Sequence, residues 1–166
     1  MSWGFFLDLD LTLPTSEWTR LAQMKTGDHR IEATWWGFAD KQLGRMFTTA
    51  DFDETTIGDA VAMFKAPESI GTVTTAGDET TLRLCQLLDR GGDPSIAKCI
   101  AALVEASKAK ARGTLRLIND GTYSGEDGVA IVVSNGRLVR SLLEDSFPMV
   151  EQLGAELYGG DIAEDA

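Results

Sequence analysis

The chain of 166 residues carries 26 acidic and 15 basic side chains, one histidine and two cysteines, for a formal net charge of −11. A domain this acidic repels nucleic acid and anionic membranes, and it attracts basic proteins and cations over distances longer than contact. The length suits a single domain, and a composition of 43% hydrophobic and 25% charged residues is typical of a folded globular protein.

Alternating residues predict an amphipathic strand over residues 3–13, with its leucines on one face and Asp8 and Asp10 on the other. Acidic residues this close to an apolar start do not fit a secretory signal. No stretch approaches the roughly 18 uninterrupted apolar residues of a membrane span. We therefore expect a cytoplasmic protein. A helix is expected next, over residues 16–25.

A second strand is predicted over residues 30–38, where Trp35 and Trp36 are adjacent. Neighbouring side chains of a strand point to opposite faces, so the two rings cannot both enter one core. Tryptophan is enriched at binding hot spots. Unless a helix covers the outer face and buries both rings, Trp36 is therefore a candidate for partner contact.

The middle of the chain predicts a helix, a strand and one ambiguous segment. Thr55 or Thr56 is expected to cap a helix whose apolar residues are Ile57, Val61 and Phe64. Residues 70–75 are β-branched and predict a short strand. Residues 79–90 fit either a helix or a strand, and the Asp before them and the Gly after them favour the helix.

The clearest helix begins at Asp93, with Pro94 at its first position. Its apolar stripe is formed by Ile96, Cys99, Ile100, Leu103 and Val104. Its last turn is expected to hold Lys108, Lys110 and Arg112, with Gly113 ending it. The two cysteines, Cys85 and Cys99, fit no metal-binding spacing and are expected to be buried, reduced thiols.

The C-terminal part predicts a strand over residues 114–118, a polar loop, a hairpin and a last helix over residues 147–158. The dipeptide Asn135-Gly136 is a strong hairpin-turn signal. It predicts the pairs Val133–Leu138, Val132–Val139, Ile131–Arg140, Ala130–Ser141 and Val129–Leu142. Because both faces of this hairpin are largely apolar, we expect it to lie centrally, covered on both sides.

These elements predict a single α+β domain over residues 1–158, with a mainly antiparallel sheet and helices packed on it. Residues 159–166 are expected to form an acidic, flexible tail. No linker, repeat or low-complexity segment divides the chain.

The sequence FFLDLDLTL, which begins at Phe5, resembles the first motif of haloacid-dehalogenase-type phosphatases, a hydrophobic strand followed by D-x-D-G-T-L. The resemblance implies that Asp8 is a nucleophile and Asp10 an acid/base, with Mg²⁺ neutralising the phosphate. The second motif and the acidic fourth motif are resembled by Ser134, Asp161 and Asp165.

Two departures weaken this comparison. Leu11 stands where the family has a glycine that turns the chain out of the strand, and no lysine follows Lys110 to supply the third motif. We therefore expect the strand to continue through Leu13. Asp8 and Asp10 are then spaced charges on a solvent-facing strand edge.

Other catalytic or metal-binding patterns are weak. The loop over residues 119–127 offers oxygen ligands for Ca²⁺ but lacks the EF-hand spacing, which favours a plain polar loop. His29, the only histidine, lies in a predicted turn and is expected at the surface. We expect neither a cofactor nor a metal, and favour a binding protein over an enzyme.

The whole chain, most visibly residues 2–18 and 121–140, resembles the immunity proteins that are paired with nuclease toxins in myxobacterial kin discrimination. The resemblance implies a cognate toxin domain as the partner. The charge points the same way, because nucleases carry basic clefts for phosphates. The alternatives are a scaffold or ligand-binding module with an unidentified partner, and a phosphatase-like enzyme using Asp8 and Asp10.

The charge excess is regional, with nine acids against four bases in residues 51–100 and five acids without a base in residues 151–166. The block that adjoins a folded helix is the better place for a basic partner. The candidate partner-binding residues are Trp36, Asp51, Asp53, Glu54, Asp59, Asp120, Glu126 and Asp127. The apolar hairpin and exposed aromatics would also permit a homodimer.

Overall fold

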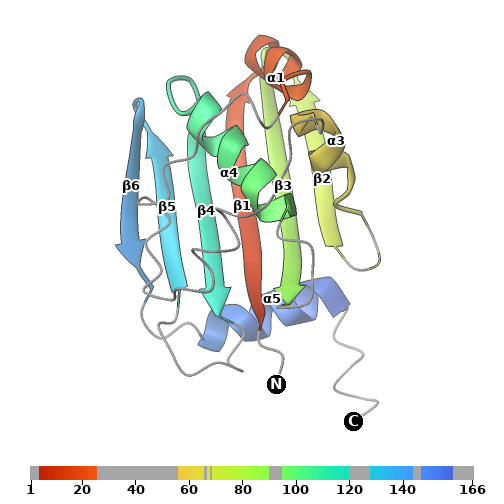
Figure 1. Ribbon diagram of the computed structural model, residues 1–166, viewed down its shortest axis with the longest axis vertical. Coiled ribbons are helices and arrows are strands. Elements are labelled where there is room, and N and C mark those ends of the chain that lie inside the picture. Colours follow the sequence, from red (N-terminus) through yellow and green to blue (C-terminus); the bar gives the residue numbers. More distant parts are fainter. Residues whose placement is uncertain are drawn as a thin grey trace.

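The computed structural model describes residues 4–25, 56–65, 67, 69–89, 95–119, 128–143 and 147–158. They form one six-stranded sheet with helices packed on it, so the predicted α+β fold with a mainly antiparallel sheet is confirmed (Figure 1). The strand order is β2-β3-β1-β4-β5-β6, and every neighbouring pair is antiparallel.

The strands are β1 (Gly4–Pro14), β2 (Ser69–Ala76), β3 (Glu79–Asp89), β4 (Arg112–Asn119), β5 (Gly128–Ser134) and β6 (Arg137–Leu142). The described helices are α1 (Thr15–Ala22), α3 (Ile57–Ala62), α4 (Ser95–Ser107) and α5 (Phe147–Tyr158). The first strand of the chain thus lies inside the sheet, between β3 and β4.

The first face of the sheet is the one that carries the leucines of β1. Alternation along this strand buries Leu7, Leu9, Leu11 and Leu13 completely. Apolar residues of α1, α3 and α4 pack against them in one core, and Figure 1 shows α4 lying along the middle of the sheet. Each such leucine contributes about 1.5–3 kcal/mol relative to an exposed position. This core therefore holds the helices on the first face.

The second face is covered at one end only, within the described residues. Leu153 and Leu157 of α5 pack there on Phe6, Cys85 and Ile118, which alternate with the leucines of the first face. Figure 1 shows α5 lying across the lower end of the sheet. The remainder of this face is polar and holds the candidate site.

The ambiguous segment is a strand, so the helix favoured for residues 79–90 was wrong. A two-residue turn, Gly77-Asp78, connects it to β2, and Ala76 pairs with Glu79. Gly77 has φ +60, which suits the first central position of a hairpin turn. Leu82 and Leu84 are fully buried with Arg83 half-exposed between them. The side chains of this segment therefore alternate between two faces, as in a strand, and do not follow the helical spacing.

Helix boundaries also differ from the predictions. The expected last turn of α4 was wrong, because the helix ends at Ser107, and Arg112 and Gly113 belong to β4. Thr56 caps α3, since its hydroxyl accepts a hydrogen bond from the Asp59 amide at 3.1 Å. Of the two threonines predicted as possible caps, Thr56 is therefore the N-cap.

The hairpin has the predicted register but not the predicted place. Every expected pair, including Val132–Val139, is present, and Asn135 and Gly136 have φ +53 and +78. However, β6 is an edge strand, so the expected cover on both faces was wrong. Val132 is 41% and Val139 57% exposed. The apolar sequence pattern did not reveal that α5 covers only the end of the second face around Phe6, Cys85 and Ile118.

Several predictions lie outside the described residues: the strand over residues 30–38, His29, the loop over residues 120–127, the Asp93-Pro94 helix start and the tail over residues 159–166. Cys85 and Cys99 are buried and form no disulfide, as expected. None of the described helices is long and apolar enough to cross a bilayer.

Gly113 lets β1 and β4 approach each other behind the polar face. It pairs with Leu11 and has φ +153. A Cβ at this position would lie 2.0 Å from the carbonyl oxygen of Asp10. Any larger residue must therefore push the two central strands apart.

We expect Gly113→Ala to lower the free energy of unfolding by about 2–4 kcal/mol, because the methyl group overpacks a strand contact and strains the backbone. Gly154→Ala is the matched control, since no atom lies within 4 Å of a Cβ there. In the middle of α5 this change should raise stability by about 0.5–1 kcal/mol. Urea unfolding followed by circular dichroism measures both, and a Gly113→Ala variant as stable as wild type would contradict the expectation.

Candidate functional site

A groove of about 580 Å³ opens on the second face over the three central strands. Its lining residues are Asp8, Asp10, Thr12, Arg83, Arg112, Gly113, Thr114 and Arg116. Apart from Gly113, whose backbone lines the groove, these side chains alternate with the buried leucines of the same strands, so the strand pleat that builds the core also presents them. The groove is polar, unlike the mainly apolar pockets that hold small organic ligands.

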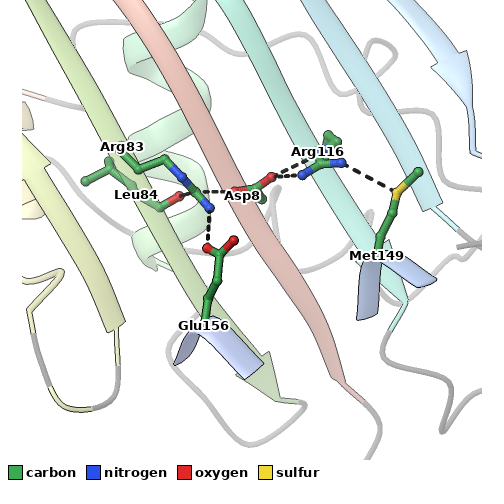
Figure 2. A network of polar contacts seen from close by, with 6 residues as sticks. All are labelled: Asp8, Arg83, Leu84, Arg116, Met149 and Glu156. Carbon is green, nitrogen blue, oxygen red and sulfur yellow. Dashed lines mark hydrogen bonds and ion pairs between the residues drawn. The ribbon is translucent and has the colours of Figure 1, made fainter. Parts of the chain in front are cut away.

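Asp8 forms the floor of the groove and is only 5% exposed. Its Oδ1 accepts a hydrogen bond from Arg83 Nη1, and its Oδ2 accepts from Arg116 Nη2 and, at 2.8 Å, from Arg116 Nε (Figure 2). Arg116 is the direct cross-strand partner of Asp8 on β4, and Arg83 lies two residues along β3 from the partner of Asp8, directly opposite Asp10. Two arginines from opposite sides thus converge on one carboxylate.

The same arginines reach α5. Arg83 Nη2 donates to Glu156 Oε2 at 3.1 Å, and Arg83 Nη1 also donates to the Leu84 carbonyl at 3.2 Å. Arg116 Nη1 lies 3.6 Å from the sulfur of Met149 (Figure 2). A buried charge is tolerated only when it is paired and hydrogen-bonded. The network therefore ties three strands and one helix together through Asp8.

Arg83 stays charged in this setting. Burial opposes the charge of its guanidinium, but the Asp8 and Glu156 carboxylates outweigh burial and hold the pKa of Arg83 above its ordinary value. The Arg83 side chain is 26% exposed to solvent. Arg83 is therefore a permanent cation whose donors are directed at its own chain.

Cys85 lies directly opposite Asp8 on β3 and is fully buried. Burial raises the pKa of its thiol to about 12, and the negative charge of Asp8 adds to this effect. The thiolate is the reactive form of cysteine. At neutral pH this thiol is therefore protonated and is not a nucleophile.

The other groove charges differ in their surroundings. Arg112 donates to both carboxylate oxygens of Glu79, at 3.1 and 3.2 Å. Asp10 is exposed and, within the described part of the chain, takes part in no ion pair. Among the described residues that line the groove, Asp10 is thus an acid without an ion pair, although Arg83 lies directly opposite it on β3.

The phosphatase motif takes another role in this fold. β1 continues to Pro14, as the leucine at position 11 predicts, and it is antiparallel to both neighbours. The solvent-facing strand edge expected for Asp8 was wrong, because β1 is central and Asp8 is buried; Asp10 is exposed. Both oxygens of Asp8 are engaged by arginines, so this carboxylate is structural.

Of the other sequence-predicted site residues, the structure describes one. Asp59 is exposed in the first turn of α3, away from the groove. Trp36, Asp51, Asp53, Glu54, Asp120, Glu126 and Asp127 lie outside the described residues. Among the described residues, no three His, Cys, Asp or Glu side chains gather as metal ligands.

Sequence reasoning missed Arg83 and Arg116, although a signal was present. Each is the centre of a Leu-Arg-Leu triplet, and Asp8 is the centre of a Leu-Asp-Leu triplet. A charge between two buried strand leucines must point to the opposite face. With Leu9-Asp10-Leu11 there are four such triplets, two positive and two negative, which could have indicated that the strands lie side by side.

We expect Asp8→Asn to lower the free energy of unfolding by roughly 3 kcal/mol, at the low end for a broken buried ion pair, because the arginines are partly solvated. The loss leaves the two arginines without the anion between them, although Arg83 keeps Glu156. Asp10→Asn, the same change two residues along the strand, should alter stability by no more than about 0.5 kcal/mol. Equal urea midpoints for the two variants would refute the structural role of Asp8.

The raised pKa of Cys85 predicts a loss of stability in alkali. The unfolded thiol ionises near its model value of 9.0, whereas the folded thiol ionises only near 12, so stability is intact below about pH 9 and falls between these values. One such group contributes a slope of up to about 1.4 kcal/mol per pH unit. In Cys85→Ala, urea unfolding from pH 8 to 10.5 should show a shallower slope. Identical slopes would contradict the assignment.

No family model, curated protein or solved structure matches this chain. Evidence on its function therefore comes from its own residues, their geometry and their charge.

Proposed function

We propose that this protein is an immunity-type inhibitor, which binds a cognate basic toxin domain in the cytoplasm and neutralises it without catalysing a reaction. The observation that carries the proposal is the acidic net charge of −11. The described residues hold 10 acids and 11 bases, so the acidic excess comes from the other residues of the chain. Among the described residues, four exposed acids lack an ion pair, against two exposed bases, Lys65 and Arg137.

Six basic side chains form ion pairs with acids of this chain, namely Arg20, Arg83, Lys108, Lys110, Arg112 and Arg116. In the described ranges, four exposed acids form no ion pair, namely Asp10, Asp59, Asp78 and Glu151. Paired cations offer little to a phosphate or an acidic surface, whereas the unpaired acids remain available to a basic one.

A nuclease toxin fits this field because its substrate cleft must be basic. An acidic inhibitor competes with nucleic acid for that cleft, and long-range attraction raises the association rate by a factor of about 10 to 10³. The resemblance of residues 2–18 and 121–140 to immunity proteins of nuclease toxins supports this choice of partner class. An inhibitor of this kind acts where the toxin meets nucleic acid, inside the cell.

The state of the groove supports binding more than catalysis. Asp8 is held by two arginines, and the neighbouring Cys85 thiol is protonated. Nucleophilic catalysis needs a group that is activated and accessible. Neither of these two groups meets that need.

The proposal predicts salt-dependent protection against a toxin. The probe is the basic C-terminal domain of a secreted protein encoded beside this gene, expressed in an inactive form for binding and an active form for growth assays. Co-expression should restore growth, and the association rate should fall at least about tenfold between 50 and 500 mM NaCl. Growth arrest despite co-expression, together with no binding at 50 mM NaCl, would end the proposal.

Two variants in residues 56–65, one in α3 and one just after it, provide opposite controls. Asp59→Asn removes an exposed negative charge and Lys65→Gln removes an exposed positive charge nearby. The first should slow association and the second should speed it, each by about twofold, because rim charges act mainly on the association rate. Changes of the same sign would contradict electrostatic attraction.

A further inference from the structure

The part of the second face that α5 leaves open contains a continuous row of side chains across all six strands. The pairing registers align Thr72, Arg83, Asp10, Thr114, Val132 and Val139. We call this set the Asp10 row. The neighbouring row toward α5 contains Asp8 and Arg116, which are engaged with each other. The Asp10 row is the next row away from α5, and Arg83 links it to that network.

Two features of this row are unusual for a surface without a partner. Asp10 is exposed and unpaired among the described residues, at the centre of the sheet. Val132 and Val139 form a direct cross-strand pair and are 41% and 57% exposed. An acid that forms no ion pair, although Arg83 is its neighbour, and an exposed apolar pair thus lie in one row of the sheet.

The spacing of these features suits a polypeptide rather than a small molecule. Adjacent strands are about 4.8 Å apart, so Val132 lies about 10 Å and Val139 about 14 Å from the Asp10 position across the sheet. The groove itself ends at β4, since its lining includes no residue of β5 or β6. A ligand that uses both features must extend beyond the groove.

Charge complementarity selects the occupant. Arg83 is held by Asp8 and Glu156, and Arg112 by both oxygens of Glu79, so a partner's anion finds these cations already paired. A partner's cation finds Asp10 unpaired. A second copy of this chain carries the same charge of −11 and is repelled.

We propose that the Asp10 row is the surface that receives the basic partner. A lysine or arginine of the toxin domain enters the groove and pairs with the Asp10 carboxylate. An aliphatic or aromatic side chain about 10–14 Å away packs on Val132 and Val139. Arg137, exposed on the same face of β6 two residues before Val139, repels a cation at that end and sets the orientation. This inference rests on the proposed function and adds its contact surface.

The test is the affinity of purified variants for the inactive toxin domain at 100 mM NaCl. Asp10→Asn should weaken binding about 30-fold or more, mainly through faster dissociation, because it removes one member of a desolvated charge pair. Val139→Thr keeps the β-branched shape and should weaken binding roughly fivefold. Asp59→Asn is the matched control, because it makes the same charge change on the helix-covered side, and should weaken binding less than about threefold.

A rescue experiment locates the contact. Asp10→Lys should abolish binding, and one Lys→Glu or Arg→Glu change in the toxin domain should restore it at least tenfold. Circular dichroism and urea midpoints near wild type would show that the exposed substitutions leave the fold intact.

The outcomes separate the two proposals. If wild type does not bind the toxin domain, the proposed function and this surface are both overturned. If wild type binds and Asp10→Asn binds equally well, only the surface is overturned. Tighter binding of Asp10→Asn would indicate an acidic occupant. A wild-type dimer that dissociates in Val139→Thr would assign the face to a second copy of the chain. Each of these two results would also overturn the proposal that the Asp10 row receives the basic partner.

Discussion

The buried carboxylate of Asp8, held between Arg83 and Arg116, is the interaction on which the rest of this structure depends. A one-residue slip of β1 against either neighbour would turn Asp8 toward the leucine core and the leucines toward the groove. The cost of an unpaired buried charge makes that alternative unfavourable. The network therefore specifies the register of the three central strands, and through Glu156 and Met149 it also positions α5.

The same network divides the second face into two parts with different roles. Near α5, charges are paired and partly buried, and the Cys85 thiol is kept protonated. Beyond it, the Asp10 row is open to solvent in the part of the chain that the structure describes. Stability, and the recognition that we propose, thus depend on aspartates only two residues apart. In the groove, the cations are engaged with acids of the chain, whereas Asp10 forms no ion pair among the described residues.

Local signals predicted what depends on neighbouring residues. The Asn135-Gly136 turn gave the whole register of the β5–β6 hairpin, because a two-residue loop leaves no other alignment. Alternation gave β1, and the Thr56 cap was one of two threonines offered. The helix prediction for Glu79–Asp89 was wrong because the leucines of this segment satisfy both helical and strand spacing. The Gly77-Asp78 turn and the pairing with β1 and β2 decide in favour of the strand.

By itself the sequence determined the fold class, most elements and the acidic charge, since periodicity, turn residues and composition act within short stretches of chain. Only the tertiary structure decided which strands are neighbours. It placed β1 in the centre of the sheet, although Asp8 was expected at a strand edge. It placed β6 at the edge of the sheet, although the hairpin was expected in the centre. It also brought Asp8 to arginines 75 and 108 residues away. The charged residues between leucines show which side chains leave the core, but their pairing over that distance depends on strand order, so the candidate site emerged only when the sheet was assembled.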